Sequence, residues 1–162
     1  SKNRAADISV LGVIKNKRVW RYISEKYVDK THENIDTWKV LVARVNGAGT
    51  IDEVLSSPLV IGPHCGYTQT FIGIGAFDTK ENAENALKYV KTKFARALLH
   101  VLKVTQDNNR DVWKYVPLQD FTDKSDINWN TSIANIDKQL YKKYGLSQEE
   151  IDFIETHVKE MV

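Results

Sequence analysis

The segment from Asp78 to Lys103, DTKENAENALKYVKTKFARALLHVLK, constrains the fold more than any other part of the chain. Its apolar residues recur with the period of an α-helix, which predicts one long amphipathic helix. Asp78 and Glu81 have the spacing of a capping box, so we expect the helix to begin there. A second side of this helix carries a basic stripe, which consists of Tyr89, Lys93, Arg96, His100 and Lys103. Such a stripe is either a solvated helix face or a surface that binds anions.

The composition limits the function classes. A chain of 162 residues with 42% hydrophobic and 27% charged residues can form one domain with a substantial core. The net charge is only +2, so binding of a polyanion would have to come from local clustering of cations. The single Cys65 excludes an internal disulfide framework and fits a reducing, cytoplasmic environment. Neither a membrane span nor a signal peptide is evident. Because the chain begins without methionine, we expect a fragment of a longer protein.

The pattern of the remaining segments predicts an α/β (α+β) fold. Residues 10–14 and 18–23 have strand character and flank the basic turn Lys15–Lys17, which indicates a hairpin. Residues 38–45 are almost entirely apolar, as in a central strand. We therefore expect a mixed, mostly antiparallel sheet packed on one long central helix. Further strands are predicted at 69–77 and 113–118, and a C-terminal helical pair at 132–144 and from 147 on, with Gly145 and a Ser147–Glu150 capping box between its helices.

The same patterns divide the chain into an α/β unit of residues 1–130 and a C-terminal helical extension of residues 131–162, packed on that unit.

The sequence lacks a catalytic constellation. Gly73 and Gly75 lie inside an apolar strand instead of between a strand and a helix, where a nucleotide loop needs its glycines. Asp52 and Asp78 could imitate a metal-dependent nuclease pair, but Asp78 is expected to cap the helix. The four histidines show no paired spacing for a metal. We therefore expect that this chain alone is not an enzyme and holds no metal.

Several short motifs occur in the same order as in a known family. Residues 88–96, KYVKTKFAR, resemble the "YxxTKF-x-R" helix in the C-terminal target-recognition region of adenine-specific restriction–modification methyltransferases. That family includes fused restriction–modification enzymes with a TaqI-like specificity domain. The resemblance covers roughly residues 38–160. Its other motifs are residues 38–42, 47–49, 103–106, 115–121, 125–129, 140–146 and 149–155.

The resemblance implies a module that recognises a double-stranded DNA sequence and follows a methyltransferase domain in the same polypeptide. The parent would be a site-specific adenine methyltransferase, with or without restriction endonuclease activity. S-adenosylmethionine is implied for that upstream domain, whereas no cofactor is expected in this chain. The Asn/Asp-Pro-Pro-aromatic catalytic loop of the family is absent here, because none of the three prolines are adjacent.

Candidate DNA contacts follow from the side-chain chemistry of this hypothesis. Cations would bind phosphates and set the register, and the candidates are Lys93, Arg96, Lys103 and Lys15. Bases would be recognised from loops, since Arg matches guanine and Asn or Gln matches adenine in the major groove. The base-reading candidates are Arg18, Arg44, Asn46, Gly47, Gly49, His64, Tyr67 and Gln69.

Two alternatives stay open at this point. The basic hairpin residues are also typical of an edge strand that resists aggregation. The whole chain could instead be a structural or interaction module, whose basic helix face docks an acidic surface of a partner domain. An apolar patch on the last helices would favour such a partner.

Overall fold

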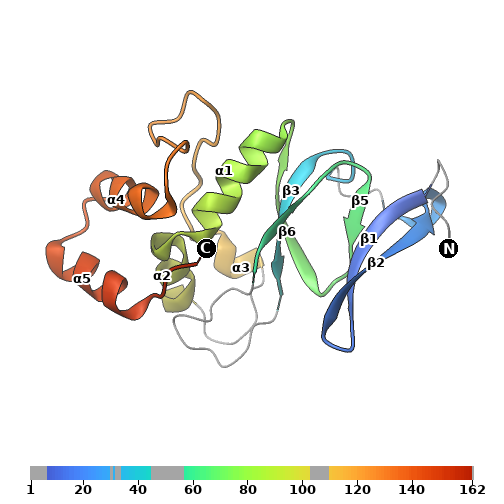
Figure 1. Ribbon diagram of the computed structural model, residues 1–162, viewed down its shortest axis with the longest axis horizontal. Helices are drawn as coiled ribbons and strands as arrows, with labels where there is room; N and C mark the ends of the chain where they lie inside the picture. Colours follow the sequence, from blue (N-terminus) through green and yellow to red (C-terminus); the bar gives the residue numbers. More distant parts are fainter. Residues whose placement is uncertain (1–6, 30, 32–33, 45–56, 103–109, 162) are drawn as a thin grey trace.

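The computed structural model describes residues 7–29, 31, 34–44, 57–102 and 110–161. Strands dominate the first half of the chain and helices the second, and the two halves lie at opposite ends of the molecule (Figure 1). The elements are β1 (Asp7–Ile14), β2 (Lys17–Ser24), η1 (Glu25–Tyr27), β3 (Trp38–Ala43), β4 (Leu59–Ile61), β5 (Cys65–Tyr67), β6 (Phe71–Phe77), α1 (Lys80–Lys91), α2 (Lys93–Leu102), α3 (Arg110–Trp113), α4 (Ile133–Lys143) and α5 (Gln148–His157).

The described strands form two sheets of three strands each, in the orders β2-β1-β5 and β4-β3-β6. The β1–β5 pairing is parallel, and the other pairings are antiparallel. The predicted α+β class is confirmed, but the expected single sheet is wrong. The strands form two separate sheets because β1 pairs with β5, which follows it by more than 50 positions, and not with β3.

The β1–β2 hairpin confirms the predicted strand, turn and strand. Its two-residue turn has φ of 49° at Lys15 and 60° at Asn16. Two positive φ values are those of a type I′ turn, whose twist matches that of the flanking strands. Asn tolerates this left-handed conformation better than most residues, whereas Lys15 adopts it at some conformational cost.

Strand β3 lies at the centre of the molecule, as its apolar sequence predicts. Val40 and Val42 pack in a core with the helices, and Leu41 packs on the opposite face. Burial of both faces explains why this strand does not alternate apolar with polar residues. The second core cluster, between the sheets, contains Leu11, Leu41, Ile61 and Phe71.

The expected single helix is in fact two helices that meet at Thr92. Thr92 has a ψ of 149°, which no helix interior allows. Its hydroxyl donates to the carbonyl of Tyr89 and accepts from the Ala95 N–H, so it ends α1 and supports the first turn of α2. The start also differs from the prediction, because Thr79, and not Asp78, caps α1 by accepting from the Asn82 N–H.

The C-terminal helical pair agrees with the prediction. Ser132 caps α4. Gly145, with a φ of 64°, donates to Lys142, while the Leu146 N–H donates to Tyr141; these are the two bonds of a Schellman motif. The predicted capping box of Ser147 and Glu150 opens α5.

One core cluster runs from β3 through α1 and α2 to both C-terminal helices, reaching Ile136, Leu140, Ile154 and Val158. The predicted extension therefore shares its core with the rest of the chain, and the division at residue 130 stays a prediction.

The strand expected at residues 113–118 is wrong. Its beginning belongs to α3, and helical turns continue through the Tyr115–Val112 and Val116–Trp113 backbone bonds. Trp113 and Val116 of this segment pack against the helical core instead of a neighbouring strand. Within the described residues, none of the helices has the length and apolar composition needed to span a bilayer.

Candidate nucleic-acid interface

Three chain segments meet at one edge of the strand half, which we call the turn edge. It consists of Lys15–Arg18, Thr68–Thr70 and Arg44. The parallel β1–β5 pairing brings the ends of these two strands together, and the Thr68 N–H donates to Leu11. The antiparallel β3–β6 pairing places the end of β3 beside the start of β6, and the Arg44 N–H donates to Thr70. The topology thus gathers residues that are more than 50 positions apart.

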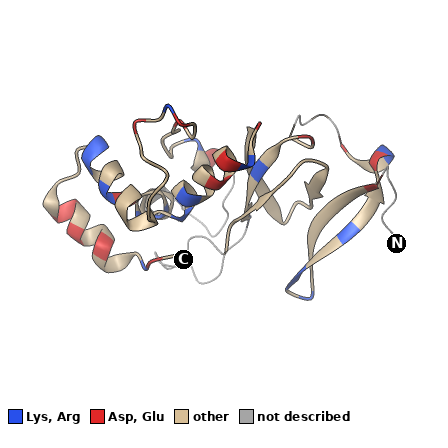
Figure 2. Ribbon diagram, turned by 45° about the horizontal axis from the view of Figure 1, so that its top comes forward, with Lys and Arg blue, Asp and Glu red and all other residues tan. Residues whose placement is uncertain are grey.

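The turn edge presents cations and hydrogen-bonding groups to solvent. Lys15, Lys17 and Arg18 are exposed on the hairpin, which Figure 2 shows at the end of the molecule away from α4 and α5. The Arg18 guanidinium donates to the Ser57 carbonyl at 2.7 Å and lies 5.7 Å from the centre of the Phe71 ring. These contacts hold the Arg18 guanidinium against Ser57 and the Phe71 ring.

A pocket of about 350 Å³ lies on this edge, at Arg44 and Gln69. Three base-reading candidates line it together: Arg44, Tyr67 and Gln69. Tyr67 is held in place because its hydroxyl accepts from the Asn34 side-chain amide at 3.0 Å. The same ring lies over Gly73, where a Cβ would overlap the Tyr67 hydroxyl. The pocket wall also includes Phe71, Ile72, Gly73 and Asp111.

His64 does not join the other candidates. It precedes β5, whereas Tyr67 ends that strand, so His64 lies at the opposite end of the sheet. Its N–H donates to Ile35, and its Nδ1 lies 3.5 Å from an Asp36 carboxylate oxygen. Both side chains are exposed. Asn46, Gly47, Gly49, Lys103 and Asp52 lie outside the described residues.

In its described residues, 89–100, the basic stripe is not an exposed surface, and the prediction of an exposed cationic helix face is wrong for them. Arg96 is 1% exposed and Tyr89 is 5% exposed. The Arg96 guanidinium donates to the carbonyls of Thr92 and Lys159, at 3.3 and 2.5 Å. The Lys93 ammonium lies 2.5 Å from Glu155 of α5. Tyr89 is buried against Phe121 and Trp129. Arg96 and the half-buried Lys93 bond to the segment after α5 and to α5 itself, and so hold this C-terminal part in place.

Lys39 is a buried cation that was not expected from the sequence. It is 0% exposed, and its ammonium lies 2.6, 3.0 and 3.2 Å from the carbonyl oxygens of Asn34, Thr37 and Gly62. Burial lowers the pKa of Lys39 to about 8, while the neighbouring Cys65 and Asp36 act in the opposite direction. Lys39 thereby ties residues 34–37 to the sheet, and Asn34 of that segment holds Tyr67. The signal in the sequence was a lysine inside an otherwise apolar strand.

Asp137 of α4 is a second buried charge that the sequence did not reveal. Its carboxylate accepts from the backbone N–H groups of Lys93 and Phe94, at 3.0 and 2.9 Å, and so caps α2 from another helix. Burial raises the pKa of Asp137 to about 6, although both N–H donors act to lower it. This contact joins α4 to the break at Thr92.

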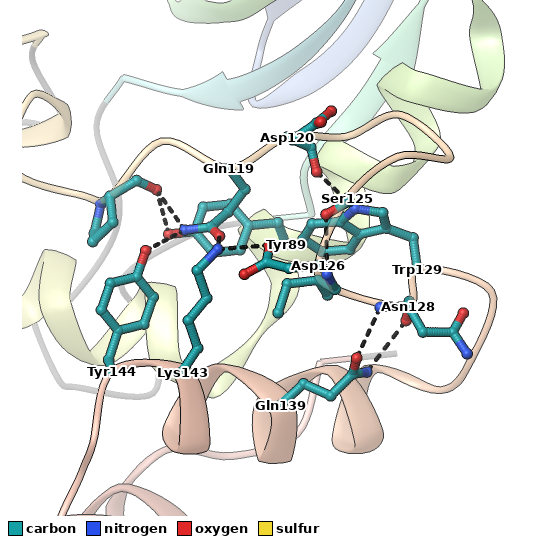
Figure 3. Close-up of polar contacts among 12 residues, drawn as sticks. Tyr89, Gln119, Asp120, Ser125, Asp126, Asn128, Trp129, Gln139, Lys143 and Tyr144 are labelled. Carbon is teal, nitrogen blue, oxygen red and sulfur yellow. Dashed lines mark hydrogen bonds and ion pairs between the residues drawn. The ribbon is translucent and has the colours of Figure 1, made fainter.

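The segment between α3 and α4 has little regular structure and is fixed by the polar contacts in Figure 3. Tyr89 of α1 donates to Pro117, and the Trp129 indole donates to Asp120. Lys143 of α4 lies 2.9 Å from Gln119 and 2.8 Å from Asp126. Many of the side chains in the motifs at 115–121, 125–129 and 140–146 therefore make internal contacts.

In the described part of the chain, no group of three or more His, Cys, Asp or Glu side chains is placed to hold a metal ion. Cys65 is a free, half-buried thiol. Comparison with known proteins adds no relative, since no family model, no curated protein and no solved structure matches the chain.

Proposed function

We propose that the chain is a sequence-specific recognition module for double-stranded DNA and that it binds through the turn edge. The observation that carries the proposal is the convergence of Lys15, Lys17 and Arg18 with the pocket formed by Arg44, Tyr67 and Gln69. The hairpin cations would bind phosphates, an interaction that sets register and depends steeply on salt. Arg44 and Gln69 carry the groups that match the major-groove edges of guanine and adenine.

The cations proposed to bind phosphate differ from those expected from the sequence. Lys93 and Arg96 are taken up by Glu155 and by backbone carbonyls, so they serve the fold. In this proposal the hairpin cations bind the phosphates instead, and α1 packs against the sheet of β3, β4 and β6. Following the family resemblance, the module would belong to an adenine-specific restriction–modification methyltransferase, in the cytoplasm. Its upstream domain would bind S-adenosylmethionine.

Selection from a randomised pool of DNA duplexes tests this function. We expect one sequence to be enriched and Arg44→Ala to lower discrimination at one guanine position by roughly 10- to 100-fold. Lys142→Ala, which removes an exposed cation of α4, is the matched control and should leave the selected sequence unchanged. Failure to enrich any sequence, or an Arg44→Ala variant with unchanged preference, would contradict the proposal.

A second candidate function is packing against another protein domain, and one observation favours it. An apolar pocket of about 460 Å³ lies between α2 and α5, lined by Phe94, Leu98, Val101 and Phe153 among others. Val101 and Phe153 are exposed. If the pocket binds the upstream domain, Phe153→Asp should prevent copurification of the two parts when they are coexpressed, and Lys142→Ala should not. Equal recovery with both variants would exclude this function.

A further inference from the structure

The outer strand β2 carries two exposed aromatic side chains on one face. Directly opposed residues of an antiparallel pair share a face, and Trp20 opposes Leu11 while Tyr22 opposes Ser9. Residues two apart in a strand also share a face, so Arg18, Trp20 and Tyr22 form one row. Trp20 is 42% exposed and Tyr22 is 37% exposed, at the end of the molecule farthest from α4 and α5 (Figure 1).

The charge of this strand is positive throughout. β2, KRVWRYIS, contains Lys17, Arg18 and Arg21 and lacks any acidic residue. Figure 2 shows these cations along the hairpin, with acidic residues confined to its far end near Asp7 and Glu25. A polyanion therefore complements the strand better than a neutral or basic partner does.

The spacing of the row suits nucleic-acid bases. Side chains two residues apart in a strand are separated by roughly 6.6 Å, about twice the 3.4 Å rise of stacked bases in one strand. Two rings at this spacing leave room for one base between them, or can each stack on one of two successive bases of an extended strand. Only unpaired bases expose a whole face to a protein ring, because the faces of paired bases are stacked inside the duplex.

We propose that β2 is a stacking platform for single-stranded nucleic acid. Trp20 and Tyr22 stack on unpaired bases, and Arg18, the cation of the same row, binds a phosphate beside them. Lys17 and Arg21 project from the opposite face of β2 and add only long-range attraction for the polyanion. The platform goes beyond the proposed duplex recognition, which uses the turn edge and the Arg44 pocket. A hydrophobic protein partner is the competing occupant of these aromatic residues, but the three cations on this edge strand oppose strand pairing with another chain.

Quenching of tryptophan fluorescence by an oligothymidylate of about 12 nucleotides tests the platform. Trp20 is the exposed tryptophan, because Trp38 and Trp113 are half-buried and Trp129 is buried. We expect quenching on binding, which Trp20→Phe abolishes with affinity largely retained. Trp20→Ala and Tyr22→Ala should each weaken binding roughly tenfold. Tyr115→Ala, which removes a 61% exposed ring that also has a lysine above it, is the matched control and should bind normally.

Several results would overturn the platform. They are absence of oligothymidylate binding, an unchanged affinity in Trp20→Ala, and equally tight Trp20-dependent binding of poly-glutamate. A dimer in size-exclusion chromatography that Trp20→Ala dissociates would assign the strand to a second copy of this chain.

Duplex binding is measured separately on the same variants, and we expect Trp20→Ala to stay within about twofold of the unmodified chain. Loss of duplex binding with single-strand binding intact would contradict the proposed function alone. The urea midpoint of Trp20→Ala should match that of Tyr115→Ala, which excludes misfolding as the cause of weaker binding.

Discussion

Arg96→Met distinguishes a fold-stabilising role of Arg96 from a DNA-binding one. The guanidinium is 1% exposed and donates to the carbonyls of Lys91, Thr92 and Lys159. Methionine fills a similar volume but donates no hydrogen bond. The Lys159 contact joins α2 to the segment after α5, where Val158 is also buried. We therefore expect the substitution to loosen the C-terminal segment first.

The magnitude follows from the hydrogen bonds that are lost. A hydrogen bond from a charged donor contributes about 1.5–3 kcal/mol, and the three acceptors here share one guanidinium, so we expect a loss of roughly 3 kcal/mol. For a chain of this size, that loss lowers Tm by roughly 6–12 °C. Urea unfolding measures the free energy. Tryptic cleavage after Lys159 measures the local effect and should become faster in the variant.

Lys142→Met is the control for Arg96→Met, because Lys142 is an exposed cation in the last turn of α4. Its unfolding free energy should stay within about 0.5 kcal/mol of the unmodified chain. The reasoning is refuted if Arg96→Met is equally stable and binds duplex DNA more weakly. In that case Arg96 would be a phosphate contact, as the sequence alone predicts.

Three further substitutions test other contacts. Lys39→Met leaves the carbonyls of Asn34, Thr37 and Gly62 without their donor and should cost roughly 2 kcal/mol in urea unfolding, whereas Lys26→Met, at an exposed position, should cost nothing measurable. For Asp137, the pKa of about 6 in the folded state exceeds the ordinary value near 3.9, so the folded state binds more protons between these pH values. The free energy of unfolding of the unmodified chain, relative to Asp137→Asn, should therefore fall by up to about 3 kcal/mol from pH 4 to pH 7, and Asp123→Asn should show no such trend. Gly73→Ala places a methyl group against the Tyr67 hydroxyl and should lower duplex affinity several-fold. The methyl group added by Gly66→Ala on β5 makes only ordinary van der Waals contacts, so this variant should keep its affinity. Equal affinity of the two variants would exclude Tyr67 from the interface.

Local signals predicted the parts of the fold that depend on neighbouring residues. The hairpin around Lys15 and Asn16, the Gly145 helix end and the Ser147 capping box each depend on a few adjacent residues, and all three are confirmed. The helix break at Thr92 was not predicted, because the apolar residues keep a regular helical period across it. The break comes from the Thr92 side chain, which competes for backbone hydrogen bonds.

The role of the basic stripe could not be predicted from helical geometry alone. Helical periodicity places Lys93 and Arg96 on one helix face, but it does not show whether that face is exposed to solvent. Their partners, Glu155 and Lys159, lie more than 60 positions away. The pocket at Arg44 could not be predicted for the same reason, because it depends on the long-range pairings of β1 with β5 and of β3 with β6. The residue types in the pocket were predictable, and their convergence was not.

The salt dependence of duplex binding tests the turn edge most directly. The triple variant Lys15→Ala, Lys17→Ala, Arg18→Ala loses three cations on the hairpin, and the matched variant Lys124→Ala, Lys138→Ala, Lys142→Ala loses three exposed cations in the helical half. We predict that the hairpin variant reduces the slope of log affinity against log salt concentration by about 2–3, at roughly 0.9 per phosphate contact, and that the matched variant leaves it unchanged. Equal slopes for both variants would contradict DNA binding at the turn edge.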